Sequence, residues 1–209
     1  MAIETIIHTI RHAQTSFSAE GRYAGSLDIP LSEEGIVASR KAAARLSEMK
    51  FDIVVTSSLK RAIETAQILV RDRAPIIQSR LCVERNFGIF QGRTRQEVQN
   101  IAPPVLWITV GHDTHSVNQQ GSEPFEKVWN RACKFRSWLF REYSGKNILV
   151  VSHGVFLQMF HGLLRGMSCI ESLAFFPSPL ELSMFSFDGR RLADEHVIKL
   201  IQSDHDIYF

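Results

Sequence analysis

The chain has 209 residues, of which 44% are hydrophobic and 22% are charged, and its formal net charge is +2. This composition is typical of a folded globular domain and excludes a chain dominated by low-complexity sequence. A net charge so close to zero argues against a sequence-independent nucleic-acid binder, which gains its affinity from many phosphate contacts. We therefore expect one domain over residues 1–209 and no nucleic-acid partner.

Cysteine usage and hydropathy bear on the compartment. Cys82, Cys133 and Cys169 are odd in number and lack C-x-x-C spacing, so neither a disulfide framework nor a zinc site is expected. The N-terminus has no basic segment followed by a long apolar run, and no stretch approaches the roughly 18 apolar residues of a membrane span. We expect a cytoplasmic protein with no membrane partner.

The first predicted strand and helix come early in the chain. Residues 6–10 are apolar at almost every position, as in a central strand buried on both faces. Ser32 is placed to cap a helix, and Glu33 and Glu34 would lie in its first turn, where they favour the helix dipole. The helical pattern continues to about Met49.

Strands and helices then alternate. Residues 51–55 form a second predicted strand, Ser57-Ser58 is expected to cap a helix over about 59–70, and residues 74–77 indicate a third strand. This alternation implies right-handed crossovers between parallel strands. The expected fold is a three-layer α/β structure, a mainly parallel sheet with helices on both faces.

The second half of the chain begins irregularly, over residues 81–120. A helix follows at 123–143, and we assign its aromatic stripe to the core rather than to a ligand site. A strand at 147–151 and a helix at about 155–164 continue the pattern. Residues 182–199, with a turn at Asp188-Gly189, predict a terminal hairpin that adds an antiparallel element to the sheet.

Arg11 and His12 directly follow the first predicted strand, and Ser152 and His153 close the strand at 147–151. In open α/β sheets, ligands bind in the crevice beyond the carboxyl ends of the strands. An imidazole accepts a phosphoryl group near neutral pH because much of it is unprotonated there. Guanidinium groups stabilise the negative charge of a phosphoryl group during its transfer. These strand ends therefore indicate an anion-handling active site.

Three further residues are candidates for this site. Arg61 lies in the first turn of a predicted helix, and helix N-termini favour phosphate. His153, if protonated, would donate to phosphate oxygens, and nearby phosphate or carboxylate charge would raise its pKa. Glu84, in the loop after the third strand, would be a general acid for the leaving oxygen and then a base for the attacking water.

Five ordered motifs give the chain a resemblance to a known family. From about residue 6 to 160 it resembles the histidine phosphatase superfamily, branch 1, also called the phosphoglycerate mutase-like family. The motifs are Arg-His-Ala-Gln-Thr at 11–15, the segment at 25–35, Ser57-Ser58 with Arg61-Ala62 and Thr65-Ala66, Leu81 with Glu84, Phe87-Gly88 and Gly92, and Val-Ser-His-Gly at 151–154.

The resemblance implies a phosphoglycerate mutase-like fold and phosphoryl transfer through histidine, with no metal ion and no cofactor. It implies that His12 is the nucleophile and Glu84 the proton donor. Arg11, Arg61 and His153 would form the phosphate pocket.

The resemblance also indicates which residues would meet the substrate. Ser18 stands where family members often have an Asn that contacts the phosphate, and Arg22 and Tyr23 would flank the substrate entrance. A variable substrate-covering segment would span about 93–125. His112 and His115 fall in this segment, and we expect an exposed loop there rather than a metal site, because no carboxylate or cysteine partner has convincing spacing.

Three departures from the family pattern refine these expectations. Ala13 replaces the usual Gly after the nucleophile, so that position must accommodate a Cβ atom. Gln91 stands where a Glu is common. The segment after Glu84 lacks the Lys- and Arg-rich continuation of cofactor-dependent mutases. Arg93 and Arg95 could reach a second anionic group, but we favour a solvated face for both. The last departure favours hydrolysis over mutase chemistry.

The expected activity is metal-independent hydrolysis of a small-molecule phosphomonoester. His12 would attack phosphorus, Glu84 would protonate the leaving alkoxide, and water would release phosphate from His12. Three alternatives stay open at this stage: a cofactor-dependent phosphoglycerate mutase, a phosphoprotein phosphatase and a noncatalytic phospholigand-binding module. A homodimer is compatible with the sequence.

Overall fold

The computed structural model describes residues 4–101, 105–117 and 120–201, and its main feature is a six-stranded sheet. The strand order is β3-β2-β6-β1-β7-β8. The bounds are Glu4–Arg11 for β1, Ile53–Ser57 for β2, Ile76–Ser79 for β3, Asn147–Ser152 for β6, Glu181–Asp188 for β7 and Arg191–Lys199 for β8.

The strands β3, β2, β6 and β1 run parallel, whereas β7 and β8 form the antiparallel hairpin that the sequence predicts. Strand β1 lies between β6 and β7 in the sheet, and both of its faces are covered, since Ile7 and Ile10 are fully buried in two different apolar cores. The register pairs Arg11 of β1 with Ser152 of β6. Two of the predicted site segments therefore leave the sheet side by side.

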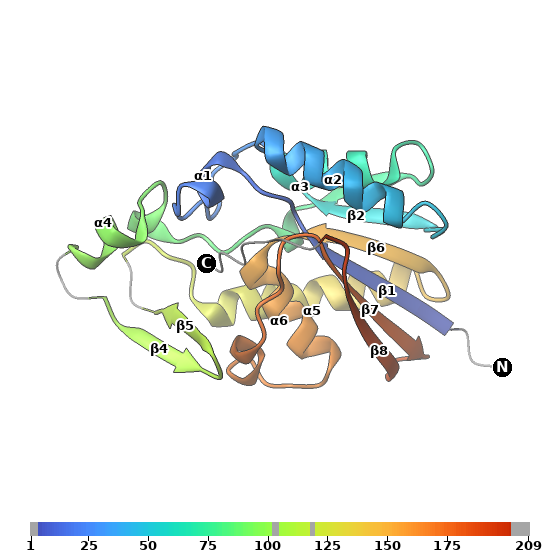
Figure 1. Ribbon diagram of the computed structural model, residues 1–209. Coiled ribbons are helices and arrows are strands. Elements are labelled where there is room, and N and C mark those ends of the chain that lie inside the picture. The colour runs from blue at the N-terminus through green and yellow to red at the C-terminus, as the bar shows by residue number, and fades with distance from the viewer. Residues whose placement is uncertain (1–3, 102–104, 118–119, 202–209) are drawn as a thin grey trace.

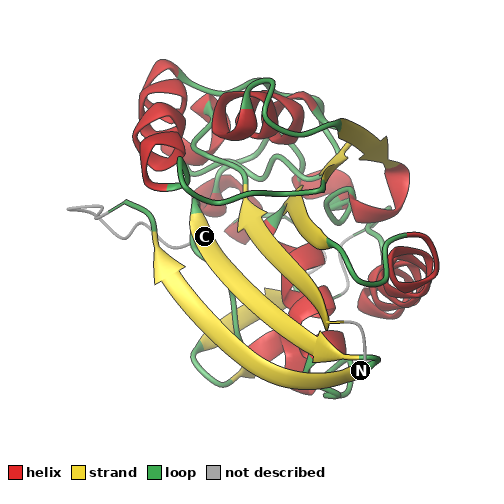
Figure 2. Ribbon diagram, turned by 90° about the vertical axis from the view of Figure 1, so that its right-hand side faces the viewer, coloured by secondary structure: helices red, strands yellow, loops and turns green. Residues whose placement is uncertain are grey.

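Helices cover both faces of the sheet, as expected (Figures 1 and 2). On one face lie α2 (Glu33–Arg45) and α3 (Lys60–Val70), and on the other α5 (Phe125–Glu142) and α6 (Gly154–Leu164). Two separate apolar cores result, one on each face. The aromatic stripe of α5 is core, as predicted, since Phe135 is fully buried against rings of α6.

Helix boundaries depart from the expectations in two places. Ser32 caps α2 as predicted, and its Oγ accepts from Gly35 N at 3.1 Å, but the helix ends at Arg45 rather than near Met49. The prediction that Ser57-Ser58 caps α3 is wrong, because Leu59 is the N-cap residue and has no side-chain cap. Ser57 instead lies within β2, and its Oγ is 2.7 Å from Nε2 of His153.

The described parts of the segment 81–120, which leave out 102–104 and 118–119, are more regular than the sequence suggests. The short helix α4 (Arg95–Gln99) and the hairpin of β4 (Trp107–Val110) and β5 (Asp113–Ser116) fall within them, with single 3-10 turns at Arg80–Cys82 and Gly88–Phe90. A short helix α1 (Ser16–Ala19) and a 3-10 turn at Glu171–Ala174 were also not expected. Figure 1 shows α1, α4 and the β4–β5 hairpin gathered at the same end of the molecule.

No helix in the described ranges is both long and apolar enough to cross a membrane.

Candidate active site

A cavity of about 360 Å³ lies beyond the carboxyl ends of the parallel strands. Seven of the eight predicted site residues line it, and His153 lies directly behind His12, with the two ring centroids 5.0 Å apart. The seven lining residues are Arg11, His12, Ser18, Arg22, Tyr23, Arg61 and Glu84. Residues predicted from widely separated segments therefore converge on one site.

His12 is held as a neutral imidazole with one unprotonated nitrogen. Its Nδ1 lies 2.7 Å from the carbonyl oxygen of Ala13, which can only accept, so Nδ1 carries the proton. The other nitrogen, Nε2, accepts a hydrogen bond from Arg61 Nε at 3.1 Å. Burial, then the positive charges of Arg61 and Arg11, hold the pKa of His12 well below its usual 6.5. The ring is therefore neutral at neutral pH, and Nε2 carries no proton.

Arg61 is only 1% exposed, and its guanidinium group is held by hydrogen bonds on all sides. Its Nη1 and Nη2 donate to the carbonyl oxygens of Leu27 and Gly25, each at 2.7 Å, while Nε is shared between His12 and Nδ1 of His153, the latter at 3.2 Å. Burial lowers the pKa of Arg61 to about 10, which leaves the guanidinium charged at neutral pH. A cation held this way needs no reorganisation when an anion arrives.

His153 is fully buried at the N-cap of α6. Because its Nδ1 accepts from Arg61, its Nε2 carries the proton and donates to Ser57 Oγ at 2.7 Å. The pKa of His153 is lowered well below 6.5 by burial and by Arg61 and His12. This direction is opposite to the sequence-based expectation, because burial disfavours the charged ring and the nearest charge is the cation of Arg61.

Arg11 is anchored by one nitrogen and keeps another without a partner. Its Nη1 donates to the carbonyl oxygen of Pro177 at 3.1 Å, and its guanidinium lies 4.9 Å from the centre of the Phe176 ring. The buried Nε atom makes no hydrogen bond within the described residues. A buried donor without a partner is costly, so Arg11 is held here by the packing around it rather than by full hydrogen bonding.

Glu84 lies at the N-terminus of α6. One carboxylate oxygen accepts from the backbone N of Arg85 at 2.7 Å and of Phe156 at 3.2 Å, and the other accepts from Val155 N at 3.2 Å. The N-terminal end of a helix attracts negative charge, which explains why a carboxylate is stable at this buried position. The side chain is thus fixed in the cavity that also contains the lone pair of His12.

The sequence matches the family model for the histidine phosphatase superfamily (branch 1) over residues 7–197. The chain belongs to this superfamily.

Individual relatives include phosphatases and a mutase-like protein. "Phosphoglycerate mutase-like protein 4" of Arabidopsis thaliana is 33% identical over 151 residues, 71% of this chain and 66% of that protein, just under two thirds of its length. "Phosphoserine phosphatase 1" of Hydrogenobacter thermophilus is 28% identical over 185 residues, 87% of this chain and 86% of that protein. The crystal structure of the α-ribazole phosphatase from Shigella flexneri shares the fold with a TM-score of 0.77 at 23% identity, covering 93% of this chain and 96% of that one.

The three residues expected to meet the substrate all have local partners, namely Ser18 at the phosphate and Arg22 and Tyr23 at the entrance. Ser18 Oγ accepts from Thr15 N at 2.8 Å and donates to Thr15 O at 2.9 Å, which caps α1. Arg22 forms an ion pair with Glu20, and the ring of Tyr23 packs on Phe87 at a centroid distance of 5.3 Å. All three face the cavity, and substrate contact by them stays a prediction.

The hairpin corrects one expectation. His115 does not lie in an exposed loop: it belongs to β5, is 8% exposed, and donates from Nε2 to the carbonyl oxygen of Leu173 at 2.9 Å. Burial lowers its pKa. His112, Asp113 and Trp107 of the same hairpin line the cavity. Within the described residues, no three His, Cys, Asp or Glu side chains form a group that could hold a metal ion.

Arg85 is a cavity residue that sequence reasoning missed. It is almost fully buried, with Nε on the carbonyl oxygen of Glu123 at 2.7 Å and Nη1 on that of Ser116 at 2.9 Å. Its guanidinium lies 3.9 Å from the centre of the Phe125 ring. The only available signal was its position next to Glu84, because both backbone partners lie more than 30 residues away in sequence.

Proposed function

We propose that this histidine phosphatase hydrolyses a small phosphorylated metabolite through a phosphohistidine intermediate, without a metal ion. The observation that carries the proposal is the unprotonated Nε2 of His12, which lies beside the fixed cation of Arg61 in the cavity that also contains Glu84. A nucleophile, an anion clamp and a proton donor are the three groups that this chemistry requires.

In the proposed first step, His12 Nε2 attacks phosphorus, a nitrogen–phosphorus bond forms, and the bond to the leaving oxygen breaks. Arg11 and Arg61 stabilise the charge on the equatorial oxygens, and His153, once protonated, donates to one of them. Glu84, which takes up a proton when the phosphate dianion enters the cavity, gives that proton to the leaving alkoxide. In the second step Glu84 takes a proton from water, which attacks phosphorus and releases inorganic phosphate from His12.

The charge of the cavity supports an anionic substrate. Five arginines line it, against the carboxylates of Glu84 and Asp113. The arginines are Arg11, Arg22, Arg61, Arg85 and Arg95. We propose that Ser18, Arg22 and Tyr23 meet the substrate and that the segment at about 93–125, through its hairpin, covers the leaving group. The enzyme would act on a small molecule in the cytoplasm as a single domain, and a homodimer is compatible with this proposal.

A phosphoglycerate mutase is the second candidate. The arginines beyond the clamp, such as Arg85 and Arg95, are the observation in its favour, because a mutase must hold a substrate with two anionic groups. A mutase would isomerise phosphoglycerate only with 2,3-bisphosphoglycerate, whereas a phosphatase releases phosphate without it. A phosphoprotein phosphatase or a noncatalytic binding module would release no phosphate from metabolites.

The test is phosphate release from a panel of sugar phosphates, phosphoglycerates, phosphoserine and nucleotide-like phosphates, with EDTA present. We expect turnover by the native protein, none by His12→Ala, and an acid-labile phosphoenzyme that forms only when His12 is present. EDTA-sensitive turnover, or full activity of His12→Ala, would refute the proposal.

A further inference from the structure

The segment that leads into Glu84 is held by its backbone carbonyl groups. Arg131 of α5 donates from Nη1 to the carbonyl oxygens of Leu81 at 2.8 Å and Val83 at 2.6 Å. Between these two, the carbonyl oxygen of Cys82 accepts from Ser152 Oγ at 2.6 Å. Three consecutive carbonyl groups, ending one residue before Glu84, are therefore fixed by side chains from other elements.

Arg131 is itself fixed on its other edge. Its Nε and Nη2 donate to the two carboxylate oxygens of Glu123, at 2.9 and 3.1 Å. The side chains of this ion pair are only 13% and 18% exposed. A planar guanidinium can bind a carboxylate with one edge and backbone carbonyls with the remaining nitrogen, whereas an ammonium group offers no such fork. The arrangement requires arginine in particular.

The Arg131 guanidinium also contacts α6, the helix whose backbone N–H groups donate to the Glu84 carboxylate. It lies 5.3 Å from the ring centre of Phe156, the residue whose backbone N–H donates to Glu84. Arg131 thus contacts both the segment that carries Glu84 and the helix turn that receives its carboxylate. No described contact joins Arg131 to the lining of the cavity directly, since it is not one of the lining residues.

We propose that Arg131 is a positioning residue for Glu84. By holding the segment before Glu84, Arg131 sets the distance from the Glu84 carboxyl group to the leaving oxygen. The inference rests on the proposed function, in which Glu84 donates the proton. Proton transfer needs heavy atoms within about 2.6–3.2 Å, and a displacement of about 1 Å can cost about 10²-fold in rate. If the carbonyl groups of residues 81–83 were no longer held, proton donation by Glu84 should therefore be impaired more than substrate binding.

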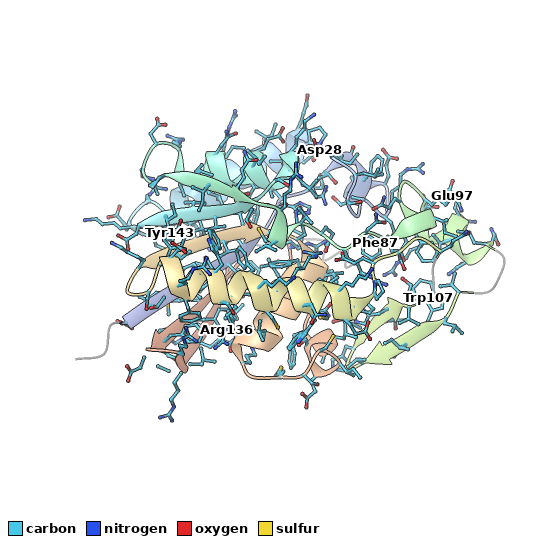
Figure 3. All side chains as sticks on the ribbon, turned by 180° about the vertical axis from the view of Figure 1, so that it is seen from behind. Asp28, Phe87, Glu97, Trp107, Arg136 and Tyr143 are labelled. Atoms are coloured by element: carbon cyan, nitrogen blue, oxygen red, sulfur yellow. The ribbon has the colours of Figure 1, made fainter. Side chains whose placement is uncertain are left out.

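Substrates with different leaving groups can distinguish this positioning role from general support of the fold. A glycerol alkoxide leaves poorly without a proton, whereas p-nitrophenolate leaves without one. We therefore compare kcat and KM for glycerol 2-phosphate and p-nitrophenyl phosphate in the native protein, Glu84→Gln, Arg131→Lys and the control Arg136→Lys. Arg136 lies on the same helix, also over a phenylalanine ring, at 5.3 Å from the centre of Phe140 (Figure 3). It has no described contact with residues 81–84.

Glu84→Gln should lose about 10²-fold or more in kcat on glycerol 2-phosphate and far less on p-nitrophenyl phosphate. Arg131→Lys should show the same selectivity with smaller losses. Its kcat should fall about 10-fold on glycerol 2-phosphate and less than about 3-fold on p-nitrophenyl phosphate, with KM nearly unchanged. Arg136→Lys should change neither substrate by more than about 2-fold. In the variant Glu84→Gln/Arg131→Lys, the two losses should not multiply, because they act on one proton transfer.

An equal loss on both substrates, or no loss, in Arg131→Lys would overturn the positioning role while leaving the proposed function intact. If Glu84→Gln itself showed no selectivity, the assigned role of Glu84 would fail and the inference with it. Should Arg131→Lys not fold, Glu123→Gln/Arg131→Gln removes both charges together and allows the same comparison. Failure of both variants to fold would make Arg131 a structural residue only and would also overturn the proposal.

Discussion

The Nε–H of Arg61 points between two imidazoles, at 3.1 Å from Nε2 of His12 and 3.2 Å from Nδ1 of His153. One proton thus meets two lone pairs, and neither histidine can be protonated on the nitrogen that faces it without losing this contact. Together with burial, the shared hydrogen bond keeps His12 and His153 both neutral.

The protonation state of His12 should follow the charges around it. Burial and the charges of Arg61 and Arg11 lower its pKa, so in the unliganded protein its ring should stay neutral well below pH 6.5. Arg11→Met removes one positive charge and should move the pKa of His12 back towards 6.5. The nitrogen chemical shifts of the His12 ring, followed against pH, measure its pKa in the native protein and in Arg11→Met. Titration of native His12 at or above pH 6.5 would contradict the structure.

Ser57→Ala tests the tautomer of His153. The substitution removes the acceptor of a buried N–H and should cost about 1–3 kcal/mol in the free energy of unfolding, with a fall in kcat as the His153 ring loses its orientation. Ser58→Ala is the matched control, because Ser58 is partly exposed and follows directly in sequence. Urea unfolding and phosphate release measure the two effects. Equal behaviour of the two variants would show that Ser57 does not orient His153.

Gly35→Ala should destabilise the protein although alanine favours helices. Gly35 lies in the first turn of α2, and a Cβ atom there would come 2.1 Å from the backbone oxygen of Gln14. The helix propensity gain of about 1 kcal/mol is therefore outweighed by a clash with rigid backbone, which typically costs about 1–3 kcal/mol. Since Gln14 follows His12 by two residues, kcat should fall as well. A rise in thermal stability would show that this loop yields without cost.

The strand ends could be predicted from the sequence because parallel strands deliver their carboxyl ends to one edge of a sheet. Apolar runs located β1 and β6, and His12 and His153 followed from them. The β4–β5 hairpin was missed although Gly111-His112, with Gly111 at a φ of 63°, is the two-residue turn that such hairpins use. Its strands of four residues are too short to stand out by period.

The contacts of Arg85 and Arg131 could not be predicted for a different reason. Each binds backbone carbonyl groups that lie at least 31 residues away, and every residue type supplies a carbonyl group. No pattern of side chains in the sequence therefore predicts which carbonyl group an arginine will bind. Sequence reasoning therefore found the groups that do the proposed chemistry and missed those that hold them, which act through the backbone of distant segments.

Acid should destabilise the fold through two buried histidines outside the active site. Burial lowers the pKa of His8 to about 4 and that of His161 to about 3. An unfolded histidine binds a proton near pH 6.5, so the unfolded state takes up more protons as the pH falls, and stability decreases from about pH 6.5 down to the folded pKa. At pH 5 the loss is about 2 kcal/mol for each histidine, at about 1.4 kcal/mol per pKa unit.

Urea unfolding at pH 7 and pH 5 measures this loss. His8→Leu replaces one of the two titrating rings by an apolar side chain in a site that packs on Phe51, and it should reduce the pH dependence by about one histidine's share. An unchanged difference between the two pH values in His8→Leu would assign the acid sensitivity to other groups.

Trp107 should affect the choice of leaving group. Its side chain is 42% exposed although it lines the cavity, and its ring lies 6.4 Å from Phe90 in a stacked orientation. Figure 3 shows Trp107 and Phe87 at the same end of the molecule, and both line the cavity together with Tyr23. An exposed indole supported from behind by another ring offers a planar surface to a ligand, and aromatic pairs gain about 0.5–1.5 kcal/mol beyond burial.

Trp107→Ala should therefore raise KM for phenyl and nucleoside phosphates by about 2- to 10-fold, as that energy implies, and leave KM for glycerol 2-phosphate nearly unchanged. Ile108→Ala is the matched control, because Ile108 is the next residue of β4, is 38% exposed and does not line the cavity. Side chains alternate along a strand, so the two substitutions change opposite faces of the same hairpin. If both variants raised KM for every substrate alike, the hairpin would act by its fold and Trp107 would not contact the leaving group.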